Sequence, residues 1–272
     1  MGDIAKKKAW TGLLVVPPLI LLIVYGPPIL LPLMVLGAIF LGLKEFYQLA
    51  LPQSKKIEHA LGMGLALMLS ALMAFANGKT VIPFFVFILF SLFFLFMITS
   101  DDLLSAISKI GVTLLGILYV GFLLSHVSLI RNLVKGQTWV LFLIATIWAG
   151  DTSAFLVGSW IGRHKLYPKI SPKKTVEGLA GAVLGSVLVS LIFRGLFIPH
   201  LNISITILVA FILGLLGQLG DLTESMLKRS AQVKDSGGLL PGHGGMLDRL
   251  DSFLFTAPFL YYVLVYWVKE AP

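Results

Sequence analysis

The run TVIPFFVFILFSLFFLFMIT, residues 80–99, contains no charged side chain over its whole length. An α-helix needs about 20 apolar residues of this kind to cross the hydrocarbon core of a bilayer. Similar runs recur along the 272-residue chain, which is 57% hydrophobic and 12% charged, with a mean hydropathy of +0.95. A soluble domain usually carries about 25% charged residues. The sequence therefore predicts an all-α, polytopic integral membrane protein.

The apolar runs predict about nine transmembrane helices, at residues 10–25, 28–50, 58–77, 80–99, 111–131, 137–160, 176–197, 203–227 and 252–269. Segment 100–110 alternates polar and apolar residues with helical spacing, and we expect it to lie along the membrane surface. We divide the chain into three parts. Residues 1–100 are N-terminal membrane helices, and residues 101–160 are middle helices with a candidate dimer contact. Residues 161–272 hold the C-terminal helices and loops with the candidate catalytic site.

The distribution of basic residues sets the orientation of these helices. If the N-terminus is cytoplasmic, only five of the 21 Lys and Arg residues fall on the outer side, namely Lys79, Arg131, Lys135, Arg194 and Lys269. Because cytoplasmic loops are the Lys- and Arg-rich ones, the N-terminus is predicted to be cytoplasmic. The same bias accounts for the net charge of +8 without a nucleic-acid partner. The absence of cysteine excludes disulfides and thiolate metal sites. The two longest polar segments, 161–175 and 228–251, then both face the cytoplasm.

The last polar segment joins two helix ends that carry carboxylates. One face of the helix before it holds, at helical spacing, Asp221, Glu224, Ser225 and Lys228. Asp248 and Asp251 share a face of the helix that follows. Converging carboxylates repel one another unless a cation lies between them, and oxygen ligands favour Mg²⁺, Mn²⁺ or Ca²⁺. The alternative is that these charges only anchor helix ends at the headgroups.

Between those helices, five of the nine residues from Gly237 to Gly245 are glycine. Glycine lets backbone N–H groups approach an anion closely, so Gly244 and Gly245 are candidate phosphate ligands. A purely flexible loop is the alternative, but basic residues flank the run: Lys228, Arg229, Lys234 and Arg249. His243 is a candidate to bridge a phosphate or act as an acid, or else a polar cap.

The other polar segment contains ISPKKTVEG, residues 170–178. Ser171-Pro172 resembles a helix start, and Thr175 could equally cap the helix that follows. A helix N-terminus beside Lys173 and Lys174 is suited to an anion. The alternative is a basic loop that rests on anionic lipid headgroups.

Asp151 lies inside a predicted span, about 12 residues or roughly 18 Å of helix from Arg163. An ionisable residue at that depth usually faces a polar cavity, so we predict that Asp151 lines one, together with Glu224. A hydrogen-bonded aspartate with a structural role is the alternative.

Residues 225–251 resemble the full signature of phosphatidate cytidylyltransferases, also called CDP-diacylglycerol synthases. The resemblance rests on S-x-L-K-R, then K-D-x-G-x-x-L-P-x-H-G-G-M-x-D-R-L-D. ISPKKTVEG is similar to a second motif of that family. GDTSAFLVG, residues 150–158, resembles a third, in which glycine and tyrosine are more usual at the positions of Ser153 and Phe155.

This resemblance implies a dimeric enzyme of the cytoplasmic (inner) membrane that uses CTP, phosphatidate and Mg²⁺, with K⁺ as a second cation, at its cytoplasmic face. By motif position, the metal-site and catalytic carboxylates would be Asp221, Asp248 and Asp251, with Lys234 also catalytic. Ser225, Lys228, Arg229 and Arg249 would contact phosphate groups.

Two other functions stay open at this point. A CTP-dependent lipid kinase of the polyprenol type also needs Mg²⁺ and basic residues, but its alcohol substrate would require a general base. An ion-coupled transporter would use Asp151 and Asp221 in an ion pathway. Internal repeats with matching broken helices, which mark many transporters, are not evident in the sequence.

Overall fold

The computed structural model describes residues 17–76, 80–100, 102–237 and 244–270. Residues 17–25 are helical. The elements that follow are α2 (Leu30–Ala50), α3 (Lys56–Phe75), α4 (Val81–Thr99), α5 (Leu103–Gly116), η2 (Ile117–Phe122), α6 (Leu123–Arg131), α7 (Gly136–Ile161), β1 (Lys165–Tyr167), β2 (Ser171–Thr175), α8 (Val176–Phe197), α9 (Ile203–Ser230), α10 (Leu247–Val263) and η3 (Leu264–Val268).

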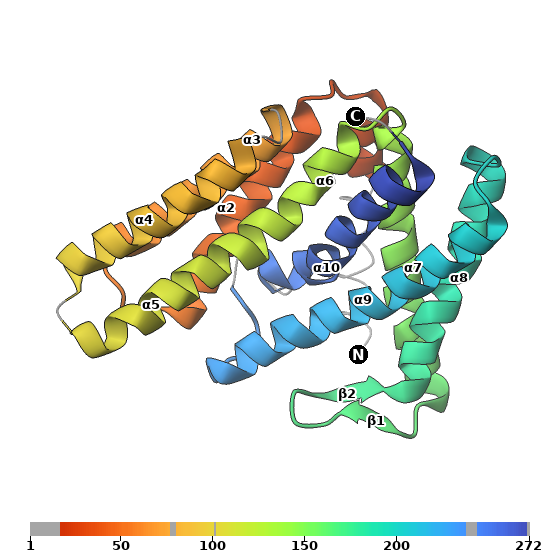
Figure 1. Ribbon diagram of the computed structural model, residues 1–272. Helices are drawn as coiled ribbons and strands as arrows, with labels where there is room; N and C mark the ends of the chain where they lie inside the picture. The colour runs from red at the N-terminus through yellow and green to blue at the C-terminus, as the bar shows by residue number, and fades with distance from the viewer. Residues whose placement is uncertain (1–16, 77–79, 101, 238–243, 271–272) are drawn as a thin grey trace.

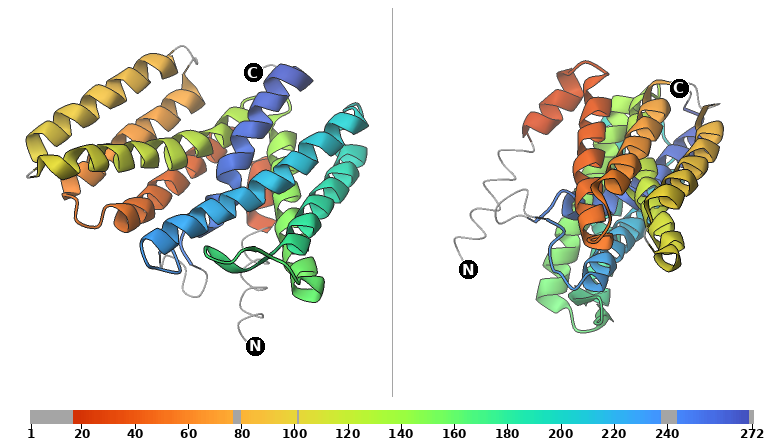
Figure 2. Two further views of the ribbon diagram at one scale, coloured as in Figure 1. Left: turned by 60° about the horizontal axis from the view of Figure 1, so that its bottom comes forward. Right: turned by 90° about the vertical axis from the view of Figure 1, so that its left-hand side faces the viewer.

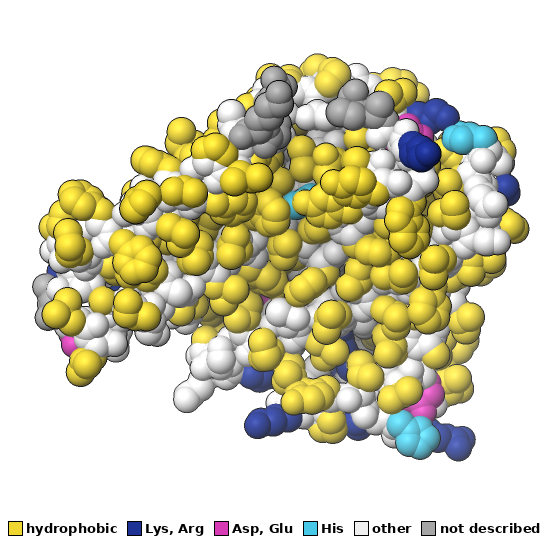
Figure 3. Space-filling view, viewed as in Figure 1, with side chains coloured by type: hydrophobic (Ala, Val, Ile, Leu, Met, Phe, Trp, Pro, Cys, Tyr) yellow, Lys and Arg dark blue, Asp and Glu magenta, His cyan; other side chains and the backbone are white. Residues whose placement is uncertain are grey.

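Eight helices in the described part of the chain are long and apolar enough to cross a membrane. They correspond to the last eight predicted spans, and the protein is an integral membrane protein. The predicted span at 10–25 lies partly outside the described residues. Hydrophobic side chains cover most of the face in Figure 3, whereas charged ones gather toward its two ends. This distribution fits helices that cross a bilayer and end in water.

Segment 100–110 was predicted to lie along the membrane surface. In the structure its described residues are continuous with the span that follows. Leu103–Arg131 forms one helical stretch of 29 residues, built from α5, η2 and α6. Ala106 and Ile110 are buried, while Leu103, Leu104 and Ile107 are exposed. Residues 103–110 are therefore the first turns of the spanning helix and not a helix apart from it.

A short antiparallel hairpin departs from the all-α prediction. β1 pairs with β2 between α7 and α8, with Lys165 opposite Thr175 and Tyr167 opposite Ser171. Ser171-Pro172 therefore begins a strand, not a helix. Thr175 is the N-cap of α8, and its hydroxyl oxygen accepts a hydrogen bond from the Gly178 amide at 3.1 Å. The second of the two predicted helix starts is the one that forms.

The helices form two connected groups (Figures 1 and 2). α2 to α6 make up the N-terminal group, and α7 to α10 with the hairpin make up the other, with α10 packed against α6 as well as α9. Small residues allow α7 and α8 to approach closely. A Cβ added at Gly181 would lie 2.7 Å from the Cβ of Val157. Close contact through small residues is the usual way in which membrane helices associate.

Candidate functional site

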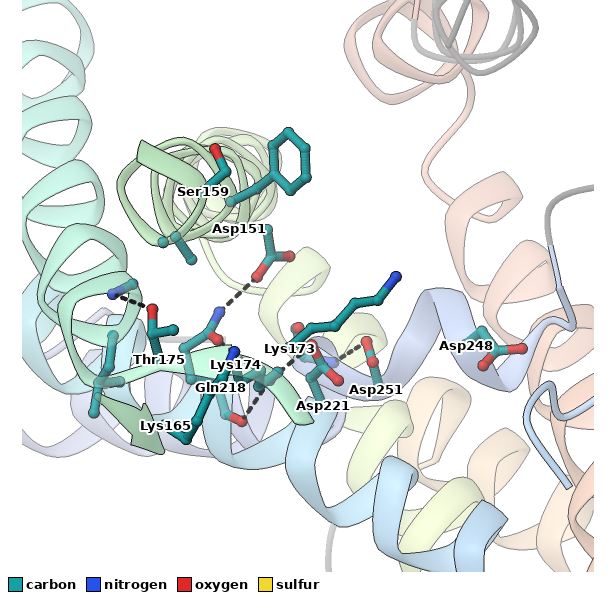
Figure 4. Close-up of a pocket in the computed structure, with 16 residues that line it drawn as sticks. Asp151, Ser159, Lys165, Lys173, Lys174, Thr175, Gln218, Asp221, Asp248 and Asp251 are labelled. Atoms are coloured by element: carbon teal, nitrogen blue, oxygen red, sulfur yellow. Dashed lines mark hydrogen bonds and ion pairs between the residues drawn. The ribbon is translucent and has the colours of Figure 1, made fainter. Parts of the chain in front are cut away.

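A cavity of about 570 Å³ opens where the hairpin meets α7, α8, α9 and α10. Figure 4 shows its polar side chains, which come from the hairpin, α7, α9 and α10. The charged and polar residues that line it are Asp151, Ser159, Lys165, Lys173, Lys174, Thr175, Gln218, Asp221, Asp248, Asp251 and Ser252. The hairpin supplies the lysines, and the helices supply the carboxylates. One cavity therefore holds both charge types that a phosphate-transfer site needs.

A hydrogen-bonded chain connects α7, α9 and the hairpin across this cavity. Gln218 Nε2 donates to Asp151 Oδ1 at 3.0 Å, and Lys174 Nζ donates to Gln218 Oε1 at 3.2 Å. The Lys174 ammonium also forms an ion pair with Asp221 Oδ2 at 2.8 Å. The deep aspartate of α7 thus faces the cavity and has a polar partner, as its position in the sequence led us to expect.

Asp248, at the start of α10, has a different environment. Lys228 Nζ contacts the carboxylates of both Glu224 and Asp248. Asp248 Oδ2 accepts hydrogen bonds from Ser236 Oγ at 2.9 Å, Ser236 N at 3.1 Å and Gly245 N at 2.7 Å. One of its two oxygens is therefore largely satisfied by the loop and the other by a lysine.

Asp251 is placed by a close approach of α9 and α10. A Cβ at Gly220 would collide with the backbone carbonyl of Asp251, so this crossing requires glycine. The Asp251 side chain accepts a hydrogen bond from the Ser252 amide at 2.6 Å. Figure 4 shows Asp221 and Asp251 near each other, with Asp248 farther from them, at the start of α10.

The amide of Gly245, a predicted phosphate ligand, and the two amides that follow it contact protein carboxylates. Gly245 N donates to Asp248, while Met246 N and Leu247 N donate to Glu45 of α2 at 2.9 Å each. Gly244 adopts a φ of 76°, which glycine tolerates. His243 lies outside the described residues.

Several other predicted site residues do not line the cavity in the described part of the chain. Glu224 was expected to line it, but this residue is fully buried beside Lys228, so that prediction is wrong. Ser225 donates to Asp221 at 3.4 Å. Arg229 donates to the carbonyls of Ile170 and Val233, and so ties the hairpin to the end of α9. Lys234 and Arg249 are exposed.

The carboxylate oxygens in the cavity are the kind of ligand that a hard divalent cation prefers. Asp221, Asp248 and Asp251, together with Asp151, line one cavity with carboxylates, and Mg²⁺ prefers such ligands. No group of three or more His, Asp or Glu side chains within the described residues is spaced to hold a metal as it stands. A cation here would therefore need a small rearrangement, such as release of Asp221 from Lys174.

Our reading of the sequence missed Gln218, Lys165, Glu45 and Ser236. Gln218 and Glu45 are polar residues inside apolar spans, and this feature could have singled them out. Lys165 lies opposite Thr175 only because β1 and β2 pair, and no local signal for that hairpin was recognised. Ser236 carries no pattern that separates it from other loop serines.

A membrane protein with a basic hairpin over a carboxylate-lined cavity is thus the class that fold and site define. Residues 6–267 match the model of the cytidylyltransferase family, and the chain belongs to that family. A phosphatidate cytidylyltransferase of Bacillus subtilis is 45% identical over 160 residues, which cover 57% of this chain and 58% of that protein. The one of Synechocystis is 36% identical over 258 residues, which cover 84% and 85%. One of Staphylococcus epidermidis is 45% identical over 152 residues, which cover 56% and 58%. The names of these relatives do not favour a lipid kinase or a transporter.

Proposed function

We propose that this protein transfers a cytidylyl group from CTP to phosphatidate, forming CDP-diacylglycerol and pyrophosphate in phospholipid biosynthesis. The observation that carries the proposal is the cavity itself. Lys165, Lys173 and Lys174 lie on the hairpin side, facing Asp221 and Asp251 on the helix side.

The reaction requires neutralisation of negative charge on the phosphates more than it requires proton transfer. Phosphatidate already carries an anionic phosphate oxygen, which forms the new bond to the α-phosphorus of CTP as the bond to pyrophosphate breaks. No general base is needed for that oxygen. Two polyanions must nevertheless be brought together, and the leaving pyrophosphate must be neutralised. The hairpin lysines are placed to do both.

The position of the cavity suits one water-soluble and one lipid substrate. Lys165 and Lys173 belong to the polar hairpin, whereas Phe155 and Leu179 line the same cavity from membrane-spanning helices. We infer that CTP enters from the hairpin side and that phosphatidate presents its headgroup from the membrane side. We place this end of the molecule at the cytoplasmic face of the inner membrane, because it carries most of the basic residues.

We further propose Mg²⁺ as the cofactor, with a second cation such as K⁺, held by Asp221, Asp248 and Asp251. When bound, the cation would stabilise the charge that develops on the departing pyrophosphate. Lys174 would then release Asp221 and turn toward substrate phosphate. We also propose a homodimer with its contact in the middle segment, where α5 exposes Leu103, Leu104 and Ile107.

The test is an assay of the purified protein in detergent with CTP, phosphatidate and Mg²⁺. We expect release of one pyrophosphate for each CDP-diacylglycerol formed. Release of CDP with a lipid alcohol as acceptor would instead indicate a lipid kinase. Absence of any CTP turnover would contradict the proposed reaction.

A further inference from the structure

Glu45 of α2 places a carboxylate from the N-terminal helices at the start of α10. Its side chain is 5% exposed. Met246 N donates to Oε1 and Leu247 N donates to Oε2, each at 2.9 Å. Ser236 Oγ lies 3.0 Å from Oε2, within hydrogen-bond distance. A single carboxylate of α2 therefore contacts both described parts of the segment that joins α9 to α10.

Two glycines of the signature segment make room for this carboxylate. A Cβ at Gly237 would lie 2.6 Å from Glu45 Oε1, and a Cβ at Gly245 would collide with Oε2. The described ends of the glycine run thus pack around Glu45. Free N–H groups at a helix start favour an anion, and here a protein side chain supplies it.

Ser236 connects Glu45 to the candidate catalytic aspartates. Its hydroxyl lies within hydrogen-bond distance of both Glu45 Oε2, at 3.0 Å, and Asp248 Oδ2, at 2.9 Å. Asp248 and Asp251 both lie in the first turns of α10. Whatever fixes the start of α10 therefore also fixes these aspartates relative to Asp221 on α9.

We propose that Glu45 is a positioning residue, which holds the start of α10 so that Asp248 and Asp251 face the cavity. For its catalytic consequence this proposal rests on the proposed function. It gives the N-terminal helices a role in the reaction beyond forming the membrane body. Glu45 does not line the cavity, so it acts through α10 rather than on the substrates.

Glu58 of α3 offers a matched control. Its carboxylate is likewise buried, and it accepts one backbone hydrogen bond, from Lys55 N, and one hydroxyl hydrogen bond, from Thr99 Oγ1, each at 3.1 Å. It joins α3 to the end of α4 instead of reaching α10. If removal of any buried carboxylate slows the enzyme, the variants of Glu45 and Glu58 should be slowed alike. If the effect comes from positioning of α10, only the Glu45 variant should be slowed.

The experiment compares Glu45→Gln with Glu58→Gln in the full-length protein, by amide hydrogen exchange and by kinetics. We expect Glu45→Gln to raise exchange at residues 244–250 while α7 and α8 stay protected. We expect kcat to fall by about tenfold or more, because misplaced catalytic groups slow the chemical step, with KM for CTP within about threefold. Glu58→Gln should leave exchange at 244–250 and kcat within about twofold of wild type.

The hydrogen-exchange measurement does not depend on turnover. It therefore distinguishes failure of this proposal from failure of the proposed function. Unchanged exchange at 244–250 in Glu45→Gln would overturn the positioning role even if the enzyme were inactive for another reason. Equal loss of kcat in both variants would also overturn it. If Glu45→Gln does not yield folded protein, Ser236→Ala replaces it. Faster exchange at 244–250 with a lower kcat and an unchanged KM would then support the proposal, and wild-type behaviour would overturn it.

Discussion

The two helix groups of this protein use polar residues in opposite ways. Around the cavity, Asp151, Gln218, Lys174 and Asp221 form a continuous chain of contacts across three elements. In the N-terminal group, polar contacts are isolated, as in the hydrogen bond from Tyr47 Oη to the Thr113 carbonyl at 3.0 Å. There, tightly packed apolar side chains fill the interior.

This difference distinguishes the helices that line the cavity from the helices that support them. A connected polar network inside a membrane protein is costly unless every member is satisfied, so it marks the region where charge is required. The N-terminal group has only a few buried charged side chains among its described residues. Glu58 joins α3 to α4 within the group, whereas Glu45 contacts the start of α10 and so connects the supporting helices to those that line the cavity.

The largest effect should come from removing a cavity carboxylate. Asp248→Asn and Asp251→Asn should each lower kcat by at least about a hundredfold, since transition-state charge loses a stabilising group. Pyrophosphate release measures this, with membrane insertion and oligomeric size as controls. If either variant kept more than a tenth of wild-type turnover, that residue would lose its assigned role.

A second, smaller effect should come from the hairpin lysines. The double change Lys173→Ala and Lys174→Ala should raise KM by about tenfold for at least one substrate, because cationic contacts to phosphate are lost. Initial rates over a range of CTP and phosphatidate concentrations measure it. Unchanged KM for both substrates would mean that the hairpin only rests on lipid headgroups.

The third effect concerns stability. Gly181→Leu should destabilise the α7–α8 contact by about 1–3 kcal/mol, since overpacking forces the helices apart. Gly195→Leu is the matched control on the same helix, because no atom lies within 4 Å of an added Cβ there. Thermal unfolding in detergent should show a lower Tm for Gly181→Leu alone. Equal Tm values would show that the α7–α8 contact is looser than described.

The smallest effect should come from the lipid-facing surface of the N-terminal group. Phe90 of α4 is 71% exposed. Phe90→Ala should change stability by no more than about 0.5 kcal/mol and leave turnover within about twofold. Tm and initial rate measure this change. A loss as large as that of the lysine variant would place the N-terminal surface within the functional part of the molecule.

Much of the fold could be predicted because a bilayer allows few solutions. Inside a bilayer, backbone N–H and C=O groups must be hydrogen-bonded within the protein, and an α-helix achieves this within one segment. The apolar runs are therefore expected to be helices, and the last eight spans follow from composition alone. The exception, α5, shows the limit of that reasoning. Its alternation of polar and apolar residues suggested a helix along the surface, but the segment continues directly into the spanning helix that ends at Arg131.

The site was harder to predict than the fold. The acidic residues of α9 and α10 were identified from their spacing, and the structure brings Asp221, Asp248 and Asp251 to one cavity. Spacing could not show that Lys228 would also contact Asp248 on the next helix, or that Lys174 would reach Asp221 from a hairpin. Gly244 and Gly245 were predicted to bind a substrate phosphate. Sequence could not show that the Gly245 amide would donate to Asp248, or that Glu45, about 200 residues earlier, would accept from the amides of Met246 and Leu247, because only tertiary packing determines these contacts.

The most direct test of the central claim follows the phosphorus atoms of CTP. CTP radiolabelled at its α-phosphorus is supplied with phosphatidate in one reaction, and CTP labelled at its γ-phosphorus in another. The reactions use wild-type protein and Asp251→Asn. The account predicts that only the α label enters the lipid fraction, that it does so in wild type, and that Asp251→Asn incorporates less than about a hundredth as much. Transfer of the γ label to lipid, or equal α incorporation by both proteins, would contradict it.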